Sequence, residues 1–111
     1  MNFILYCVDK ADHGHVRAEN RPAHLEYLNS QVGRIVLGGP MTTEDGSAPI
    51  GSLIVIEAKD RADAEAFAAG DPYAKAGLFE SVTVKPFKRV LTWWHVGCWR
   101  RRRELGLGRK R

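Results

Sequence analysis

His24 is the side chain in this 111-residue sequence best suited to moving protons near neutral pH. It lies beside Leu25, Leu28 and Val32, whose spacing of three and four residues predicts the apolar face of a helix. A histidine at the edge of that face is expected to point into the crevice between a helix and a sheet. It would then be either an acid–base catalyst or a half-buried histidine bonded to a backbone carbonyl. The residues alone favour the second interpretation.

Two other charged side chains could take part in such chemistry. Asp71 precedes Pro72 at the start of a short predicted helical turn, where capping the helix N-terminus is the ordinary role of an aspartate. Arg21 lies three residues before His24, on nearly the same helical face, and could bind a substrate carboxylate through two hydrogen bonds. A solvated surface arginine is an equally good interpretation of Arg21.

Several smaller features are compatible with a ligand site. Ser52 and Tyr73 could donate hydrogen bonds to an oxyanion, and Gly38-Gly39-Pro40 would let the backbone approach a ligand closely, although a simple turn also explains these three residues. The chain contains neither a GxGxxG phosphate-binding motif nor a P-loop. With neither motif present, the sequence gives no reason to expect a nucleotide cofactor.

Metal binding is not expected. His13 and His15 lie close to Asp12 in a polar segment, but their spacing matches no metal-binding motif, so solvent-exposed loop histidines are the favoured interpretation. Cys7 and Cys98 belong to no CxxC or Cys/His cluster and are interpreted as two free thiols.

The elements that position these residues follow from apolar periodicity and from turn signals. A loop is expected over residues 9–18, and Asn20 and Gly33 are expected to cap the first helix. We predict strands over residues 3–8, 35–37, 52–56 and 81–85, helices over 21–32 and 61–69, and a helical turn over 71–77. This β-α-β-β-α-β order predicts a ferredoxin-like α+β fold, in which a four-stranded antiparallel sheet carries both helices on one face.

The third strand predicts an oligomer. Leu53, Ile54, Val55 and Ile56 leave that strand without a polar side, so both faces of the sheet need a cover. One domain of this length offers helices for one face only. We therefore expect a homodimer in which two sheets pack face to face.

Charge divides the chain into two parts. Residues 100–111 hold seven Lys/Arg and one acid, whereas the other 99 residues carry a net charge of −2. We predict a domain over residues 1–90 and a basic extension over 91–111. Three tryptophans beside four arginines (Trp93, Trp94, Trp99 and residues 100–103) could contact nucleic acid or a membrane surface, but an extension whose tryptophans pack on the body or on a partner is favoured. No apolar run long enough to cross a bilayer and no export signal are recognised, so a cytoplasmic location is expected.

Five segments in order resemble the YCII (YciI-like) family. They are residues 21–28 (RPAHLEYL), 38–40 (GGP), 51–52 (GS), 68–79 (AAGDPYAKAGLF) and 84–87 (VKPF). Each motif alone is weak, but five in sequence are specific. The resemblance covers residues 1–90 and stops near Leu91.

The resemblance implies both a fold and a chemistry. The family is similar to muconolactone isomerase and other dimeric α+β barrel proteins, and some relatives are dehydrochlorinases, while most have no assigned substrate. His24 matches the family's characteristic histidine, and Asp71 matches the aspartate that pairs with it and holds its tautomer. This implies a cofactor-independent lyase or isomerase acting on a small carboxylate-bearing metabolite, with Arg21 on the carboxylate and Ser52 or a backbone N–H on the oxyanion. The alternative is a non-catalytic small-molecule-binding or interaction domain. A hydrogen bond between His24 and Asp71 beside a cavity would favour the enzyme.

Overall fold

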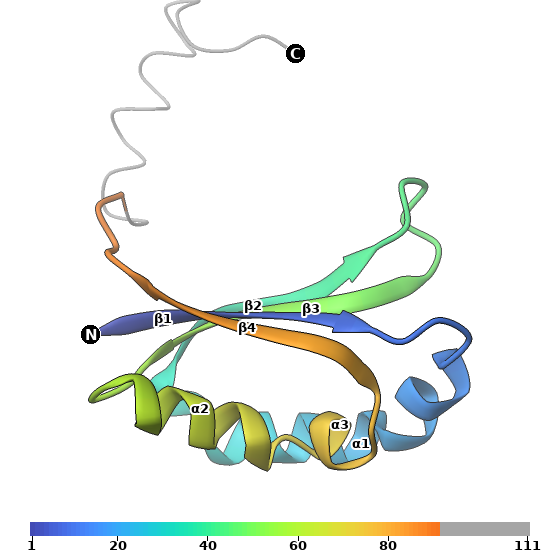
Figure 1. Ribbon diagram of the computed structural model, residues 1–111, viewed down its shortest axis with the longest axis horizontal. Coiled ribbons are helices and arrows are strands. Elements are labelled where there is room, and N and C mark those ends of the chain that lie inside the picture. The colour runs from blue at the N-terminus through green and yellow to red at the C-terminus, as the bar shows by residue number, and fades with distance from the viewer. Residues whose placement is uncertain (92–111) are drawn as a thin grey trace, which may run out of the picture.

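A four-stranded antiparallel sheet with one layer of helices on a single face makes up the computed structural model, which describes residues 1–91 (Figure 1). The elements are β1 (Asn2–Asp9), α1 (Gly14–Ser30), a 3₁₀ turn (Val32–Arg34), β2 (Ile35–Thr42), β3 (Pro49–Glu57), α2 (Arg61–Gly70), α3 (Pro72–Lys75) and β4 (Phe79–Phe87). This is the predicted β-α-β-β-α-β order, with α3 as a short helix between α2 and β4. The ferredoxin-like α+β fold expected from the sequence is confirmed.

The sheet has the strand order β2-β3-β1-β4, and all neighbouring strands are antiparallel. The apolar strands β1 and β3 lie in the centre, where Leu5 stands opposite Ile54. Each edge strand contains a proline in its interior, Pro40 in β2 and Pro86 in β4, whereas the central strand β3 has a proline only as its first residue, Pro49. Proline is tolerated inside an edge strand because one side of such a strand forms no ladder hydrogen bonds.

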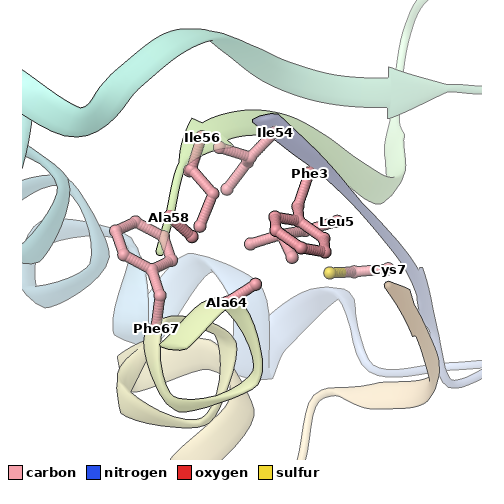
Figure 2. Close-up of a cluster of buried hydrophobic side chains, with 8 residues drawn as sticks. All are labelled: Phe3, Leu5, Cys7, Ile54, Ile56, Ala58, Ala64 and Phe67. Carbon is pink, nitrogen blue, oxygen red and sulfur yellow. The ribbon is translucent and has the colours of Figure 1, made fainter. Parts of the chain in front are cut away.

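The main apolar cluster lies between the central strands and α2 (Figure 2). Alternate side chains of β1 and β3 point toward the helices, because successive residues of a strand face opposite sides of the sheet. The cluster consists of Phe3, Leu5, Cys7, Ile54, Ile56, Ala58, Ala64 and Phe67. It fixes α2 on the sheet, and α1 lies beside α2 on the same face (Figure 1).

The first helix differs from its prediction. It begins at Gly14 rather than residue 21 and ends at Ser30, so residues 14–18, the second half of the expected loop, are helical. Asn20 is not an N-cap, because its side-chain amide donates to the carbonyl of Val16 within the helix. Pro22 lies inside the helix rather than in its first turn.

The end of α1 also differs from its prediction. The C-cap is Gln31, and Gly33 belongs to the 3₁₀ turn that follows. Val32 lies outside the helix and is 69% exposed, so the predicted apolar face is incomplete. The buried residues of α1 are instead two polar ones, Arg17 and His24. A periodicity of apolar residues cannot reveal a helix that buries polar groups.

Strand β2 is longer than predicted. It continues through Gly38-Gly39-Pro40, with Gly39 opposite Leu53 and Pro40 opposite Ser52 of β3. Glycine and proline do not end the strand here, because an edge strand accepts residues that a central strand would not.

The predictions for Trp93, Trp94, Trp99 and the basic run lie outside the described residues. Over residues 1–91, no helix has the length and apolar character needed to cross a membrane.

Candidate active site

A cavity of about 220 Å³ lies between α1 and the β2–β3 half of the sheet. Its polar lining consists of Arg17, Arg21, His24, Ser52 and Tyr73. Its remaining walls are the apolar side chains Leu25, Leu28 and Ile54 and the segment Gly38-Gly39-Pro40. The structure therefore brings every predicted site residue except Asp71 to the wall of one cavity, and Asp71 contacts that wall through His24.

His24 and Asp71 form a buried pair at this cavity. His24 Nδ1 lies 2.8 Å from Oδ1 of Asp71, and the two side chains are 9% and 5% exposed. Asp71 Oδ1 also accepts the backbone N–H of Tyr73 at 2.9 Å, as the N-cap of α3. One oxygen therefore both caps the helix and holds the histidine. With an acceptor at Nδ1, this nitrogen carries the proton, and Nε2 of the neutral ring keeps its lone pair.

Tyr73 fixes the plane of the histidine ring. The two rings stack with their centroids 3.9 Å apart and an interplanar angle of 13°. Tyr73 is only 1% exposed. Burial raises the pKa of its phenol, although the positive charges of Arg17 and Arg21 act in the opposite direction. The hydroxyl therefore stays protonated at neutral pH and can serve as a hydrogen-bond donor.

Arg17 is a buried member of the site that the sequence analysis missed. Its Nε and Nη2 atoms donate to the two carboxylate oxygens of Asp9 at 2.8 and 2.9 Å, and Nη2 also donates to Ser52 Oγ at 3.0 Å. Its guanidinium carbon lies 4.7 Å from the centroid of the Tyr73 ring. Burial alone would lower the pKa of Arg17, but the hydrogen bonds and charge of Asp9 raise it above its usual value.

Two sequence signals could have indicated Arg17 and Asp9. Arg17 precedes His24 by seven residues, which is about two helical turns. Asp9 follows directly after the apolar run of β1, at the end of a central strand. Neither residue predicts that α1 begins as early as Gly14, because Val16 is the only large apolar residue between Gly14 and Asn20.

The sequence profile of the YCII-related domain matches residues 1–88. The chain belongs to the YCII family. The protein named YciI of Escherichia coli is 40% identical to it over 97 residues, which cover 81% of this chain and 99% of that protein. An uncharacterised protein of Haemophilus influenzae is 30% identical, with the same coverage.

A solved structure of similar fold is that of 5-chloro-2-hydroxyhydroquinone dehydrochlorinase from Burkholderia phenoliruptrix AC1100, in complex with 2,5-dihydroxybenzoquinone. The TM-score is 0.73 and the sequence identity 35%, over 79% of this chain and 94% of that chain. The match confirms the ferredoxin-like fold of the dimeric α+β barrel class. It is consistent with an enzyme that binds a small molecule.

Arg21 differs from the two other basic residues that line the cavity of this YCII domain, Arg17 and His24. It lies between Arg17 and His24 on α1 and lines the cavity, yet its side chain is exposed and forms no ion pair within residues 1–91. Its charge is therefore available to an anion that enters from solvent.

His13 and His15 lie at the start of α1, away from the cavity. Their ring centroids are 6.0 Å apart, and His13 Nδ1 contacts the carbonyl of Ala11 at 2.7 Å. Within residues 1–91, no three side chains of His, Cys, Asp or Glu are grouped as metal ligands.

Proposed function

We propose that this YCII protein is a cofactor-independent lyase or isomerase that uses His24 for acid–base chemistry on a small carboxylate-bearing molecule. The observation that supports this most directly is the hydrogen bond between His24 Nδ1 and the buried Asp71, on the wall of a cavity. The similarity to a dehydrochlorinase at 35% identity supports an elimination as one form of this chemistry.

In the proposed reaction, His24 acts first as a base. Asp71 holds the proton of Nδ1, so Nε2 removes a proton from the carbon next to a carbonyl group of the substrate. The carboxylate of Asp71 stabilises the imidazolium ion that forms. The resulting enolate then either expels a leaving group such as chloride, which gives elimination, or takes a proton back at another carbon, which gives isomerisation.

The other cavity residues suit the same substrate. Arg21 would bind the carboxylate through two N–H groups. Ser52 and Tyr73 would donate to the oxygen that becomes negative as the enolate forms. The backbone of Gly39 and Pro40 forms the opposite wall and limits the substrate to a small molecule, because the cavity holds only about 220 Å³.

Proton exchange tests this proposal even when the product of the reaction is not known. Small 2-oxo acids, hydroxymuconate-like acids and lactone acids are incubated with the protein in D₂O, and NMR follows the loss of their carbon-bound protons. Chloride release from 5-chloro-2-hydroxyhydroquinone is measured in parallel. The wild type should catalyse one of these reactions, and His24→Ala should lower the rate by about 10²–10⁴-fold.

His15→Ala is the matched control, because it removes a histidine of the same helix that is exposed and outside the cavity. This variant should keep the wild-type rate. A His24→Ala protein as active as the wild type would refute the proposed base. An acid that binds without any exchange or elimination would instead favour the non-catalytic binding domain.

We also propose that the protein acts as a homodimer in the cytoplasm. The helices lie on one face of the sheet (Figure 1). By the alternation along the strands, the opposite face carries Tyr6 and Leu37, which are 45% and 55% exposed, next to the half-buried Ile4 and Leu53. A second copy would cover this apolar face. Sedimentation at micromolar concentration should give a dimer for the wild type and a monomer for Tyr6→Lys/Leu37→Lys. A monomeric wild type would contradict the dimer, and cell fractionation checks the location.

A further inference from the structure

Three buried polar side chains from three elements meet at the end of the cavity away from Asp71. Asp9 ends β1, Arg17 lies in the second turn of α1, and Ser52 lies in β3. Arg17 is 6% and Ser52 3% exposed. The proposed proton transfer at His24 does not explain why an arginine is buried here.

The chemistry of the guanidinium group fixes the direction of the hydrogen bond between Arg17 and Ser52. A guanidinium group has N–H donors and no acceptor, so Ser52 Oγ must accept in the 3.0 Å contact with Nη2. The single proton of the Ser52 hydroxyl must then point in another direction. Within residues 1–91, this hydroxyl donates no hydrogen bond to the protein, and Ser52 lines the cavity. A buried donor without an acceptor is unfavourable, so an acceptor atom of a ligand would satisfy it.

Asp9 prevents Arg17 from acting as an anion receptor itself. Two hydrogen bonds of 2.8 and 2.9 Å join the guanidinium group to both carboxylate oxygens, so the charge of Arg17 is neutralised within the protein. Arg21, one turn further along α1, forms no such pair within residues 1–91. The two arginines therefore have different roles, since Arg21 is free to bind an anion and Arg17 is fixed in place.

We propose that Asp9 and Arg17 are positioning residues that orient the Ser52 hydroxyl as a hydrogen-bond donor to the negative oxygen of the bound substrate. This inference rests on the proposed function, in which His24 creates that oxygen by removing a proton from the neighbouring carbon. Asp9 orients Arg17, Arg17 occupies a lone pair of Ser52, and the Ser52 proton is directed into the cavity. Removing one oxyanion donor lowers the rate of an enzyme by about 10²–10³-fold.

A mutant cycle tests whether Arg17 acts through Ser52. The variants are Ser52→Ala, the double variant Asp9→Leu/Arg17→Met, and the triple variant that combines all three changes. The double variant replaces the whole ion pair with apolar side chains, which buried sites often tolerate. The rate of proton exchange is measured for the acid that the wild type exchanges fastest.

We expect Ser52→Ala and the double variant each to lower kcat by about 10²-fold, and the triple variant to be no slower than Ser52→Ala. If the double substitution slows the Ser52→Ala protein as much as it slows the wild type, Arg17 does not act through Ser52. If the double variant keeps the wild-type kcat, the ion pair positions nothing. Should the double variant fail to fold, Arg17→Lys replaces it, because lysine keeps the charge but lacks the planar fork and should give the same loss.

The binding of oxalate and acetate tests this inference separately from the proposed function. Both anions carry a carboxylate for Arg21, and only oxalate offers further oxygen acceptors that imitate an enolate. Ser52→Ala and the double variant should each weaken oxalate binding about tenfold and leave acetate binding within about threefold of the wild type. Equal binding of oxalate to all three proteins would overturn the role of Asp9 and Arg17, whatever His24 does.

Discussion

The two ends of the cavity have the same plan and different chemistry. At each end a basic side chain of α1 is held by a buried aspartate, His24 by Asp71 and Arg17 by Asp9. His24 shares one hydrogen bond of 2.8 Å with its aspartate, whereas Arg17 shares two. Histidine exchanges its proton readily near neutral pH, and arginine stays protonated.

His24 and Arg17 can therefore do different chemistry. The His24 end can transfer a proton, whereas the Arg17 end can only fix the positions of neighbouring atoms. Tyr73 lies against both, since its ring stacks on His24 and contacts the guanidinium group of Arg17. One helix thus contributes to the same cavity an imidazole ring and a guanidinium group whose charge Asp9 neutralises.

The largest expected effect is on stability, and it differs between substitutions of Asp9 and Asp71. Asp9→Asn leaves the charge of Arg17 buried without a counter-charge, which should lower the free energy of unfolding by about 3 kcal/mol. Asp71→Asn should cost only about 1 kcal/mol, because the neutral ring of His24 leaves no buried charge without a partner. Urea denaturation at pH 7 measures both values. Equal losses, or a larger loss for Asp71→Asn, would mean that the two pairs do not differ in this way.

The main effect of Asp71→Asn should be on activity. Asp71→Asn should slow proton exchange by about 10²-fold, because its amide oxygen can still accept from His24 and from the Tyr73 N–H but no longer stabilises the imidazolium ion. The measurement is the NMR exchange rate of the folded variant. An unchanged rate would reduce Asp71 to a helix cap.

The thiol of Cys7 is influenced by the charges of both aspartates, Asp71 and Asp9. Burial raises the pKa of its thiol to about 12, and the charges of Asp71 and Asp9 add to the rise. The thiol therefore stays protonated in the folded protein at pH values where the unfolded chain loses this proton, so its contribution to stability is complete below about pH 9 and is lost toward pH 12.

Urea denaturation of the wild type and Cys7→Ala checks this sign. Between about pH 9 and pH 11, the wild type should lose about 1.4 kcal/mol more per pH unit than Cys7→Ala does. Cys98 is present in both proteins and cancels in the comparison. Parallel curves would show that Cys7 titrates normally in the folded state.

The smallest effect is expected from removal of the C-terminal extension. Within residues 1–91 the last strand or helix ends at Phe87, and every residue that lines the cavity lies before it. We therefore propose that residues 1–90 form the domain and that truncation after Leu91 changes neither the melting temperature nor the dimer. Thermal melting and size-exclusion chromatography measure both. A truncated chain that fails to fold or to dimerise would assign the extension a structural role.

The sequence indicates the fold well because the central strands and α2 bury apolar residues. The run of β1 and the continuous apolar run of β3 can be identified without a structure, and the order of elements follows from them. Strand β2 is predicted too short, because Gly39 and Pro40 resemble a turn in sequence and form an edge strand in the fold.

The site can be predicted only in part. His24 and Asp71 stand out by residue type and by resemblance to a family, and the structure joins them by a hydrogen bond of 2.8 Å. Arg17 and Asp9 do not, because a buried ion pair joins residues of two elements and leaves no periodic signal in either. The start of α1 escapes prediction for the same reason, since the helix buries Arg17 rather than an apolar side chain there.

The spacing of Arg17 and His24 also limits how this protein can change in length. Seven residues turn an α-helix by about 700°, close to two full turns, so both side chains face the same cavity. One residue inserted or deleted between them would rotate one side chain by about 100° relative to the other. The connection between β2 and β3 has no such constraint, since it contributes nothing to the cavity wall. Homologous sequences should therefore vary in length in that connection and not within α1.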